Sequence, residues 1–138
     1  MNRTDFQHLA ELRVREAEAL RQAGSLEGAY YLLGYAVEFA LKACFCKRIA
    51  QHDFPDKKLV DKAYSHDLER LMEISGVQAP FNNAVGLNPA LGLKWKTAVV
   101  WDEQSRFITS LAASEVDALF EAVLHPADGV LTWLKTQW

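Results

Sequence analysis

The chain has 138 residues, 50% of them hydrophobic and 24% charged, which favours one globular domain over residues 1–138 and excludes a disordered chain. A domain of this length buries roughly two thirds of its unfolded surface, so it needs neither disulfides nor a structural metal. The net charge of -3 and the pI near 5.8 exclude a surface that is basic throughout and attracts nucleic acid without specificity.

The first predicted helix begins at Thr4, whose hydroxyl can cap it, and runs to about Ala23. Gly24 is a good C-terminal stop, and Ser25 can cap the next helix directly after it. So short a turn predicts that the first two helices are antiparallel neighbours. The charged start of the chain lacks the apolar core of a signal segment.

The segment 26–50 is the strongest predicted helix and is apolar almost all round. A helix of this kind is enclosed by other helices, so we expect it at the centre of the fold. Its apolar run also raises the possibility of a membrane span, but Glu38 and Lys42 lie in the middle and Gly34 interrupts it. These residues favour a core helix and no association with a membrane.

The two cysteines, Cys44 and Cys46, lie on this helix at a spacing that points them about 200° apart, so they cannot bridge each other. A Cys-x-Cys pair without a second cluster is a poor metal signal, and the histidines show no ligand spacing. The sequence therefore predicts free thiols in a reducing, cytoplasmic compartment, and neither a metal nor a cofactor.

Residues 42–62 carry a local excess of three positive charges. This excess is interpreted either as an ordinary solvated surface or as a basic rim that meets phosphate. Residues 52–64, polar and interrupted by Pro55, are predicted to form a loop.

A short helix is predicted from His66 to about Ser75, capped by Ser65 and ended by Gly76. Residues 77–92 contain two prolines, two glycines and an Asn pair, so this region is expected to be the least regular and the most mobile. A helical stretch with Trp95 follows, beginning at about Pro89.

Residues 101–110 are predicted to be turn or extended chain. Ser114 with Asp117 resembles a capping box and predicts the start of the last helix, which Pro126 must kink or restart before an apolar stripe continues to Trp138. No strand pattern of useful length is present. We therefore predict an all-α fold of four to six helices.

Three stretches of the sequence belong together. They read Gly28-Ala29-Tyr30-Tyr31-Leu32-Leu33-Gly34-Tyr35-Ala36-Val37-Glu38-Phe39-Ala40-Leu41-Lys42-Ala43, then Tyr64-Ser65-His66-Asp67-Leu68-Glu69-Arg70-Leu71, then Trp95 with Trp101-Asp102-Glu103-Gln104-Ser105-Arg106-Phe107. With these stretches the chain resembles bacterial HEPN-domain proteins over roughly residues 5–135. The resemblance implies an up-and-down helical bundle, often dimeric. Many members act on RNA or pair with a small nucleotidyltransferase, often in toxin–antitoxin modules.

Catalytic members of that family carry an Arg followed, after four to six residues, by His, and this chain lacks the motif. The window after Arg106 reads Leu111-Ala112-Ala113, and the window after Arg70 reads Ser75-Gly76-Val77. Arg48 precedes His52 with only three residues between them. The standard metal-independent RNase mechanism is therefore not expected here.

Glu38 and Lys42 lie one helical turn apart, in the favourable order for an ion pair. They form either a satisfied pair at the surface or a polar strip that faces a cleft, joined by Tyr31 or Tyr35. His66, at a helix start, belongs either to a capping cluster with Ser65 and Asp67 or serves as a proton donor or acceptor.

Trp101, Asp102, Glu103 and Arg106 form a dense polar and aromatic cluster. Arg106 either ties a loop to the bundle, with Glu103 in pairing distance, or binds a phosphate with its planar guanidinium. Trp101 either stacks on a base or belongs to the core.

The predicted ligand site, if there is one, joins Glu38, Lys42, His66, Trp101 and Arg106 where the central helix meets the other two segments. Two functions stay open. One is a non-catalytic binding module that engages a nucleotidyltransferase or an RNA-associated partner. The other is an atypical RNase or nucleotide-processing enzyme in which Arg106 and His66 are the catalytic candidates.

A homodimer, or binding to a partner helix, is expected from apolar surface at Phe120, Trp133 and Trp138 beyond what one helical face can bury.

Overall fold

The computed structural model describes residues 1–50 and 55–138, and in these residues the fold is all α with no strand. The described chain contains eight α-helices and one short 3-10 helix, so the prediction of an all-α fold is confirmed and the prediction of four to six helices is wrong. The elements are α1 (Arg3–Gln22), α2 (Leu26–Ala50), α3 (Lys57–Ala63), α4 (Leu68–Ile74), α5 (Gln78–Leu87), α6 (Pro89–Ala98), η1 (Glu103–Phe107), α7 (Ala113–Leu124) and α8 (Val130–Leu134).

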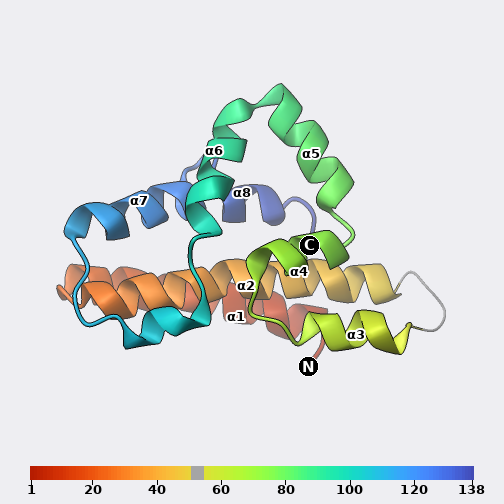
Figure 1. Ribbon diagram of the computed structural model, residues 1–138, viewed down its shortest axis with the longest axis horizontal. Helices are drawn as coiled ribbons and strands as arrows, with labels where there is room; N and C mark the ends of the chain where they lie inside the picture. The colour runs from red at the N-terminus through yellow and green to blue at the C-terminus, as the bar shows by residue number, and fades with distance from the viewer. Residues whose placement is uncertain (51–54) are drawn as a thin grey trace.

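The two long helices, α1 and α2, lie side by side and antiparallel, as the short turn predicts (Figure 1). Asn2 caps α1 in place of Thr4: its side chain accepts from the Asp5 backbone N–H, and the Asp5 carboxylate accepts from the Asn2 N–H. Gly24 makes the turn at a φ of 80°, a left-handed conformation that favours glycine.

Helix α2 is the centre of the fold, with α1, α4, α7, α8 and η1 packed around it (Figure 1). Eleven of its 25 residues are buried, and these supply much of the single hydrophobic core. By length and composition it is also the one described helix that could cross a membrane, yet 61% of its apolar window is buried inside the fold. Its apolar character is thus explained by neighbouring helices.

Two helices, α3 and α5, lie where the sequence predicts loop or irregular chain. Residues 55–64 were expected to be loop, but Asp56 accepts a hydrogen bond from the Lys58 N–H at 3.0 Å and starts α3. The other part of that predicted loop, including His52, lies outside the described residues. Residues 77–92 were expected to be irregular, yet they form α5 and the first part of α6.

The prolines in this region do not break the helices because of where they lie. Pro80 is in the first turn of α5 and Pro89 is the first residue of α6, where a missing N–H interrupts no helical hydrogen bond. The hairpin of α5 and α6 is anchored by Phe81, whose ring packs edge-on against Trp95 and Trp133. The expected start of a helix at Pro89 is confirmed.

Helices α7 and α8 complete the cover of α2. Glu115 begins α7 by accepting from the Ala112 N–H at 3.0 Å, so the predicted Ser114–Asp117 pair does not make this cap. The helix ends at Leu124, before Pro126, and the chain turns into α8.

The expectation of an exposed Phe120 is wrong, because its ring is buried against the core. Trp133 and Trp138, the other two residues expected at the surface, are partly buried, and both pack on the core.

Burial of Cys44 in α2 predicts a pH dependence of stability. It raises the pKa of this thiol from 9.0 to about 11. As the pH rises through that interval, the unfolded chain holds fewer protons than the folded one, so stability should fall, by about 1.4 kcal/mol per pH unit for this group. Guanidinium unfolding of the wild type and of Cys44→Ala, at pH values below and within the interval, would measure the two slopes. The wild type should show the steeper loss, and equal slopes would contradict the argument.

Candidate functional site

The candidate site is built on Glu38, a carboxylate that α2 holds in the protein interior. Its side chain is 1% exposed, so its charge needs partners. One turn later on the helix, the Lys42 ammonium lies 2.7 Å from the Glu38 carboxylate, with 13% of the lysine side chain exposed. The predicted pair therefore forms, and it forms largely inside the protein rather than at the surface.

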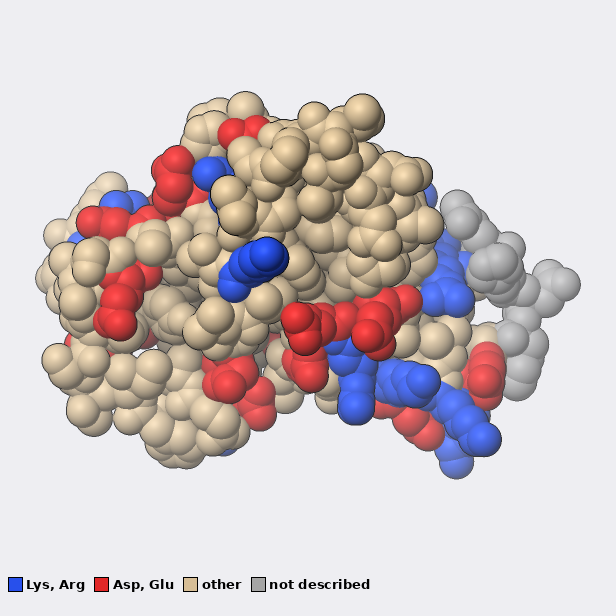
Figure 2. Space-filling model, turned by 45° about the horizontal axis from the view of Figure 1, so that its top comes forward, with Lys and Arg blue, Asp and Glu red and all other residues tan. Residues whose placement is uncertain are grey.

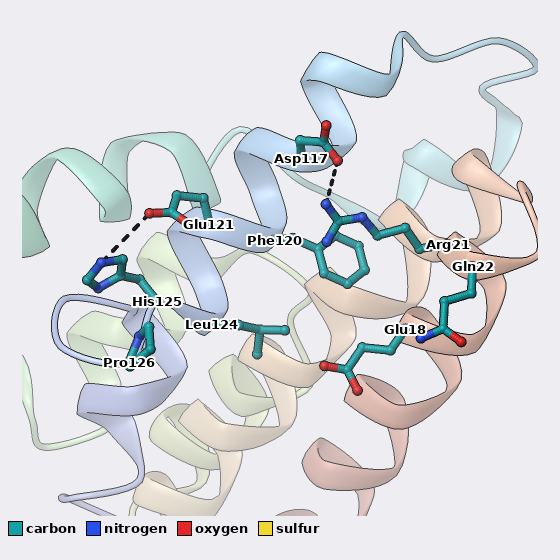
Figure 3. Close-up of a pocket in the computed structure, with 9 residues that line it drawn as sticks. All are labelled: Glu18, Arg21, Gln22, Asp117, Phe120, Glu121, Leu124, His125 and Pro126. Atoms are coloured by element: carbon teal, nitrogen blue, oxygen red, sulfur yellow. Dashed lines mark hydrogen bonds and ion pairs between the residues drawn. The ribbon is translucent and has the colours of Figure 1, made fainter.

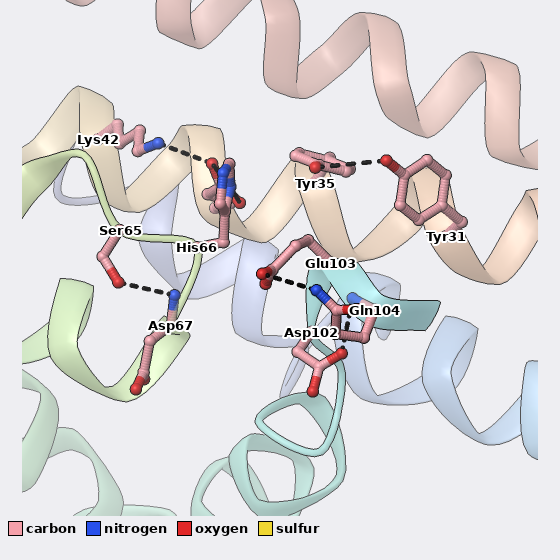
Figure 4. A network of polar contacts seen from close by, with 10 residues as sticks. Tyr31, Tyr35, Lys42, Ser65, His66, Asp67, Asp102, Glu103 and Gln104 are labelled. Atoms are coloured by element: carbon pink, nitrogen blue, oxygen red, sulfur yellow. Dashed lines mark hydrogen bonds and ion pairs between the residues drawn. The ribbon is translucent and has the colours of Figure 1, made fainter. Parts of the chain in front are cut away.

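His66 is the second partner of Glu38 and comes from the segment between α3 and α4. Its Nδ1 lies 3.1 and 3.0 Å from the two carboxylate oxygens (Figure 4). In the neutral imidazole, a carboxylate beside Nδ1 favours the tautomer in which Nδ1–H donates to Glu38 and Nε2 is an acceptor. Within the described chain Nε2 makes no hydrogen bond, and 45% of the side chain is exposed. His66 is therefore an oriented imidazole with one nitrogen available to a ligand.

The residues around His66 fix the backbone of its segment. Asp67, rather than Ser65, is the N-cap of α4 and accepts from the Arg70 N–H at 3.1 Å. The Ser65 hydroxyl accepts from the Asp67 N–H at 3.0 Å. The capping interpretation of this cluster is thus correct, although α4 begins at Leu68 and His66 itself precedes it.

Loss of this cap should have a measurable cost. We expect Asp67→Ala to destabilise the protein by about 1 kcal/mol, because it leaves an N–H of the first turn of α4 unpaired. Asp61→Ala, an exposed position within α3, serves as the control and should change stability by less than about 0.5 kcal/mol. Urea unfolding of the two variants would show the difference. Equal effects would mean that the cap does not hold the His66 segment.

Aromatic residues connect this polar cluster to η1. The Tyr35 ring packs edge-on against the Trp101 indole at 5.1 Å between centroids and against the His66 ring at 6.0 Å. The Tyr35 hydroxyl lies 3.4 Å from that of Tyr31 (Figure 4). Trp101 is 2% exposed and lies over Gly34, so the structure places it in the core beneath the site, with its indole N–H unpartnered in the described residues.

Arg106 lies on η1, next to this cluster but not joined to it. Its guanidinium packs over the Phe107 ring, 4.8 Å from the centroid, and both side chains are exposed. In the described part of the chain no hydrogen bond or ion pair links Arg106 to Glu38, Lys42, His66 or Glu103. The anticipated Glu103–Arg106 pair is therefore not formed.

Glu103 is the residue of this region that sequence reasoning placed in the cluster but not in the site. Hydrogen bonds from its own backbone N–H and from the Gln104 amide, together with the nearby His66 and Arg106, lower the pKa of its carboxyl group. These neighbours thus favour the ionised form of the carboxylate. In the sequence, the position of Glu103 at the start of a polar turn was the indication of a role in the site. The contact of that turn with the His66 region depends on the fold and could not be predicted.

A hollow of about 600 Å³ lies between α1 and α7, away from the Glu38 cluster (Figure 3). Arg21 contacts Asp117 at 2.6 Å and packs over the Phe120 ring, so its charge is satisfied. His125 Nδ1 accepts backbone N–H groups of the turn before α8. These side chains hold the helices together, and the Glu38 cluster stays the better candidate.

The six cations of residues 42–62 do not form one basic rim. Lys42 is bound to Glu38, and Lys47 and Arg48 donate to the backbone carbonyls of Gln137 and Ile74. The other three, Lys57, Lys58 and Lys62, are exposed on α3. Figure 2 shows blue side chains gathered at that end of the molecule, with red ones among them. Among the described residues no group of three His, Cys, Asp or Glu side chains could hold a metal ion.

Comparisons with protein-family models, with curated proteins and with solved structures find no match to this chain.

Proposed function

We propose that the protein is a HEPN-like helical binding module, non-catalytic and homodimeric, that works in the cytoplasm. Its partner would be a small nucleotidyltransferase, or an RNA or nucleotide, in a system of the toxin–antitoxin type. The up-and-down bundle of the family belongs to this proposal, and two long antiparallel helices at the centre of the fold are compatible with it.

One observation carries the preference for binding over cleavage. Lys42 and His66 are both bound to the buried Glu38, while Arg106 packs over Phe107 and shares no contact with them. An RNase of this kind needs a cation that is free to stabilise charge on the phosphate, whereas Lys42 is already paired with Glu38. The sequence lacks the Arg-x(4–6)-His spacing as well, which supports the same preference.

The experiment is a search of the neighbouring genes for a small nucleotidyltransferase, followed by co-purification of that protein with this chain. We expect the two proteins to elute together in size-exclusion chromatography, and His66→Ala or Arg106→Ala to weaken the complex. Lys96→Ala removes an exposed cation of α6 and is the matched charge control for Arg106→Ala. Separate elution, or no such neighbouring gene, would count against the module.

The second candidate function is an atypical RNase or nucleotide-processing enzyme. The observation in its favour is the His66 imidazole, oriented by the buried Glu38 and open at Nε2, as a general base must be. Arg106 would then move toward the phosphate. Incubation of the wild type, His66→Ala and Arg106→Ala with total RNA separates the candidates. Cleavage that either substitution abolishes would establish the enzyme.

A further inference from the structure

Another hollow, of about 590 Å³, lies where the C-terminal part of α2 meets the turn between α4 and α5. Figure 1 shows that the C-terminus of the chain lies close to the same turn. The size of this hollow is in the range of pockets that hold small molecules. It is lined by Cys44, Lys47, Arg48, Glu73, residues 75–80 and Gln137.

Two cations of α2, Lys47 and Arg48, are held in place at this hollow. The Lys47 ammonium donates to the backbone carbonyl of Gln137 at 2.7 Å, and the Arg48 guanidinium donates to that of Ile74 at 2.7 Å. The Arg48 stem lies across Gly76, with its Cδ 3.0 Å from the place that a Cβ would take there. Both side chains are half-buried, so the fold and not the solvent sets their directions.

The charges of these two cations are not neutralised. A backbone carbonyl accepts one hydrogen bond but carries no net charge, and each cation keeps further N–H donors. Within residues 1–50 and 55–138, neither Lys47 nor Arg48 forms an ion pair, although the exposed Glu73 also lines the hollow. Two oriented, half-buried cations without a partner of opposite charge favour an anion between them.

The start of α5 adds neutral donors to the same hollow. The N-cap residue of this ten-residue helix, Val77, makes no side-chain cap. The first N–H groups of a helix have no partner within it, so those of Gln78 and Ala79 supplement the cations. Residues 75–80 contain no charged side chain that would repel an anion.

We infer that this hollow binds the phosphate group of a small molecule. Arginine and lysine both bind phosphate, and the several oxygens of a phosphate can accept from donors on α2 and α5 at once, more than a carboxylate can. Two cations are too few for RNA, which proteins hold through many phosphate contacts. The inference goes beyond the proposed function, because the hollow shares no residue with the Glu38 cluster.

The test is calorimetric titration of the full chain, at low ionic strength, with inorganic pyrophosphate, adenosine diphosphate and acetate. We expect both phosphate compounds to bind and acetate to bind far more weakly. Equal affinity for the two would identify a free phosphate as the ligand, and tighter binding of adenosine diphosphate would identify a nucleotide. If neither binds at millimolar concentration, or if acetate binds as well as they do, the inference is wrong.

Substitutions locate the binding in this hollow. Arg48→Gln and Lys47→Gln should each raise the dissociation constant of pyrophosphate about 10-fold or more, as the loss of a charged hydrogen bond does. Glutamine can still donate to the same carbonyl, and circular dichroism would verify that the variants are folded. Lys62→Gln, an exposed cation of α3, is the matched control and should bind like the wild type.

Glu73→Gln should act in the opposite direction. It removes the one carboxylate among the described residues that line the hollow, so pyrophosphate should bind about threefold more tightly or better. A damaged fold would not produce this gain, which keeps the test decisive even if an Arg48 variant unfolds. Unchanged affinity in Arg48→Gln and Lys47→Gln, or weaker binding by Glu73→Gln, would overturn the inference. The nucleotidyltransferase and RNA experiments use His66 and Arg106, so their failure is distinguishable from this one.

Discussion

Gly34→Ala should destabilise the protein by about 2–3 kcal/mol, although alanine is ordinarily the better helix residue by about 1 kcal/mol. A Cβ atom at this position would lie 2.0 Å from ring atoms of Trp101. The indole cannot move aside easily, because it is buried and packs against Tyr35. The clash should displace Trp101 and with it η1, so Glu103 and Arg106 would change their positions relative to His66 and partner binding would fall as well.

Gly86→Ala is the matched control. Gly86 also lies in a helix, α5, but a Cβ there meets nothing within 4 Å. This variant should therefore be stabilised, by about 0.5–1 kcal/mol, as glycine-to-alanine changes in open helix positions are. Guanidinium unfolding of both variants gives the comparison. In Gly34→Ala/Trp101→Leu the cost should be smaller than the sum of the two single costs, because both act on one contact. Strict additivity would show that Trp101 does not press on Gly34.

The central part of this fold could be predicted because its signals are local. The apolar run of 26–50, the glycine at 24 and the serine after it define two antiparallel helices without any tertiary information, and the structure gives Leu26–Ala50 for the second. The cap of α1 was misplaced because Asn2 and Thr4 are both good caps, and the reciprocal bond with Asp5 selects Asn2.

The helices of the α5–α6 region could not be predicted, because the composition of this region indicates a loop while the positions of its prolines are compatible with helices. Prolines and glycines are typical of loops, but here Pro80 and Pro89 occupy helix starts and Gly92 lies close against Val85 between the two helices. Whether a proline breaks a helix depends on the residue at which the helix begins. The position of α5 is stabilised by the contacts of Phe81 with Trp95 and Trp133, which are tertiary and cannot be seen in the sequence.

The candidate site was predictable to the extent that one helix carries it. The i, i+4 spacing indicated the Glu38–Lys42 pair, and His66 was selected as a titratable group at a helix start. The contact between His66 and Glu38 joins residues 28 positions apart and is set by the packing of α4 on α2. Arg106 has the right chemistry for the site, but its planar face is used by Phe107.

Lys42→Met should destabilise the protein by about 3 kcal/mol, more than any other single change in the site. Methionine keeps most of the aliphatic length of lysine, so packing changes little, while the carboxylate of Glu38, 1% exposed, loses its ammonium partner. Breaking a buried ion pair on one side costs about 3–5 kcal/mol, because an uncompensated charge remains inside. The lower end applies here, since the His66 N–H still donates to Glu38.

Two further variants separate this account from simple loss of packing. Lys42→Met/Glu38→Leu removes both charges and should regain most of the lost stability, as a buried pair replaced by apolar residues does. His66→Ala alone should cost about 1 kcal/mol or less, since Lys42 still neutralises Glu38 and the imidazole is 45% exposed. In the Lys42→Met background the same His66→Ala change should cost clearly more, because Glu38 then has no partner among these residues.

Urea unfolding of the four variants measures the coupling. If Lys42→Met costs no more than His66→Ala, or if Lys42→Met/Glu38→Leu is less stable than Lys42→Met, Glu38 is not the buried charge that holds His66 and α4 against the central helix.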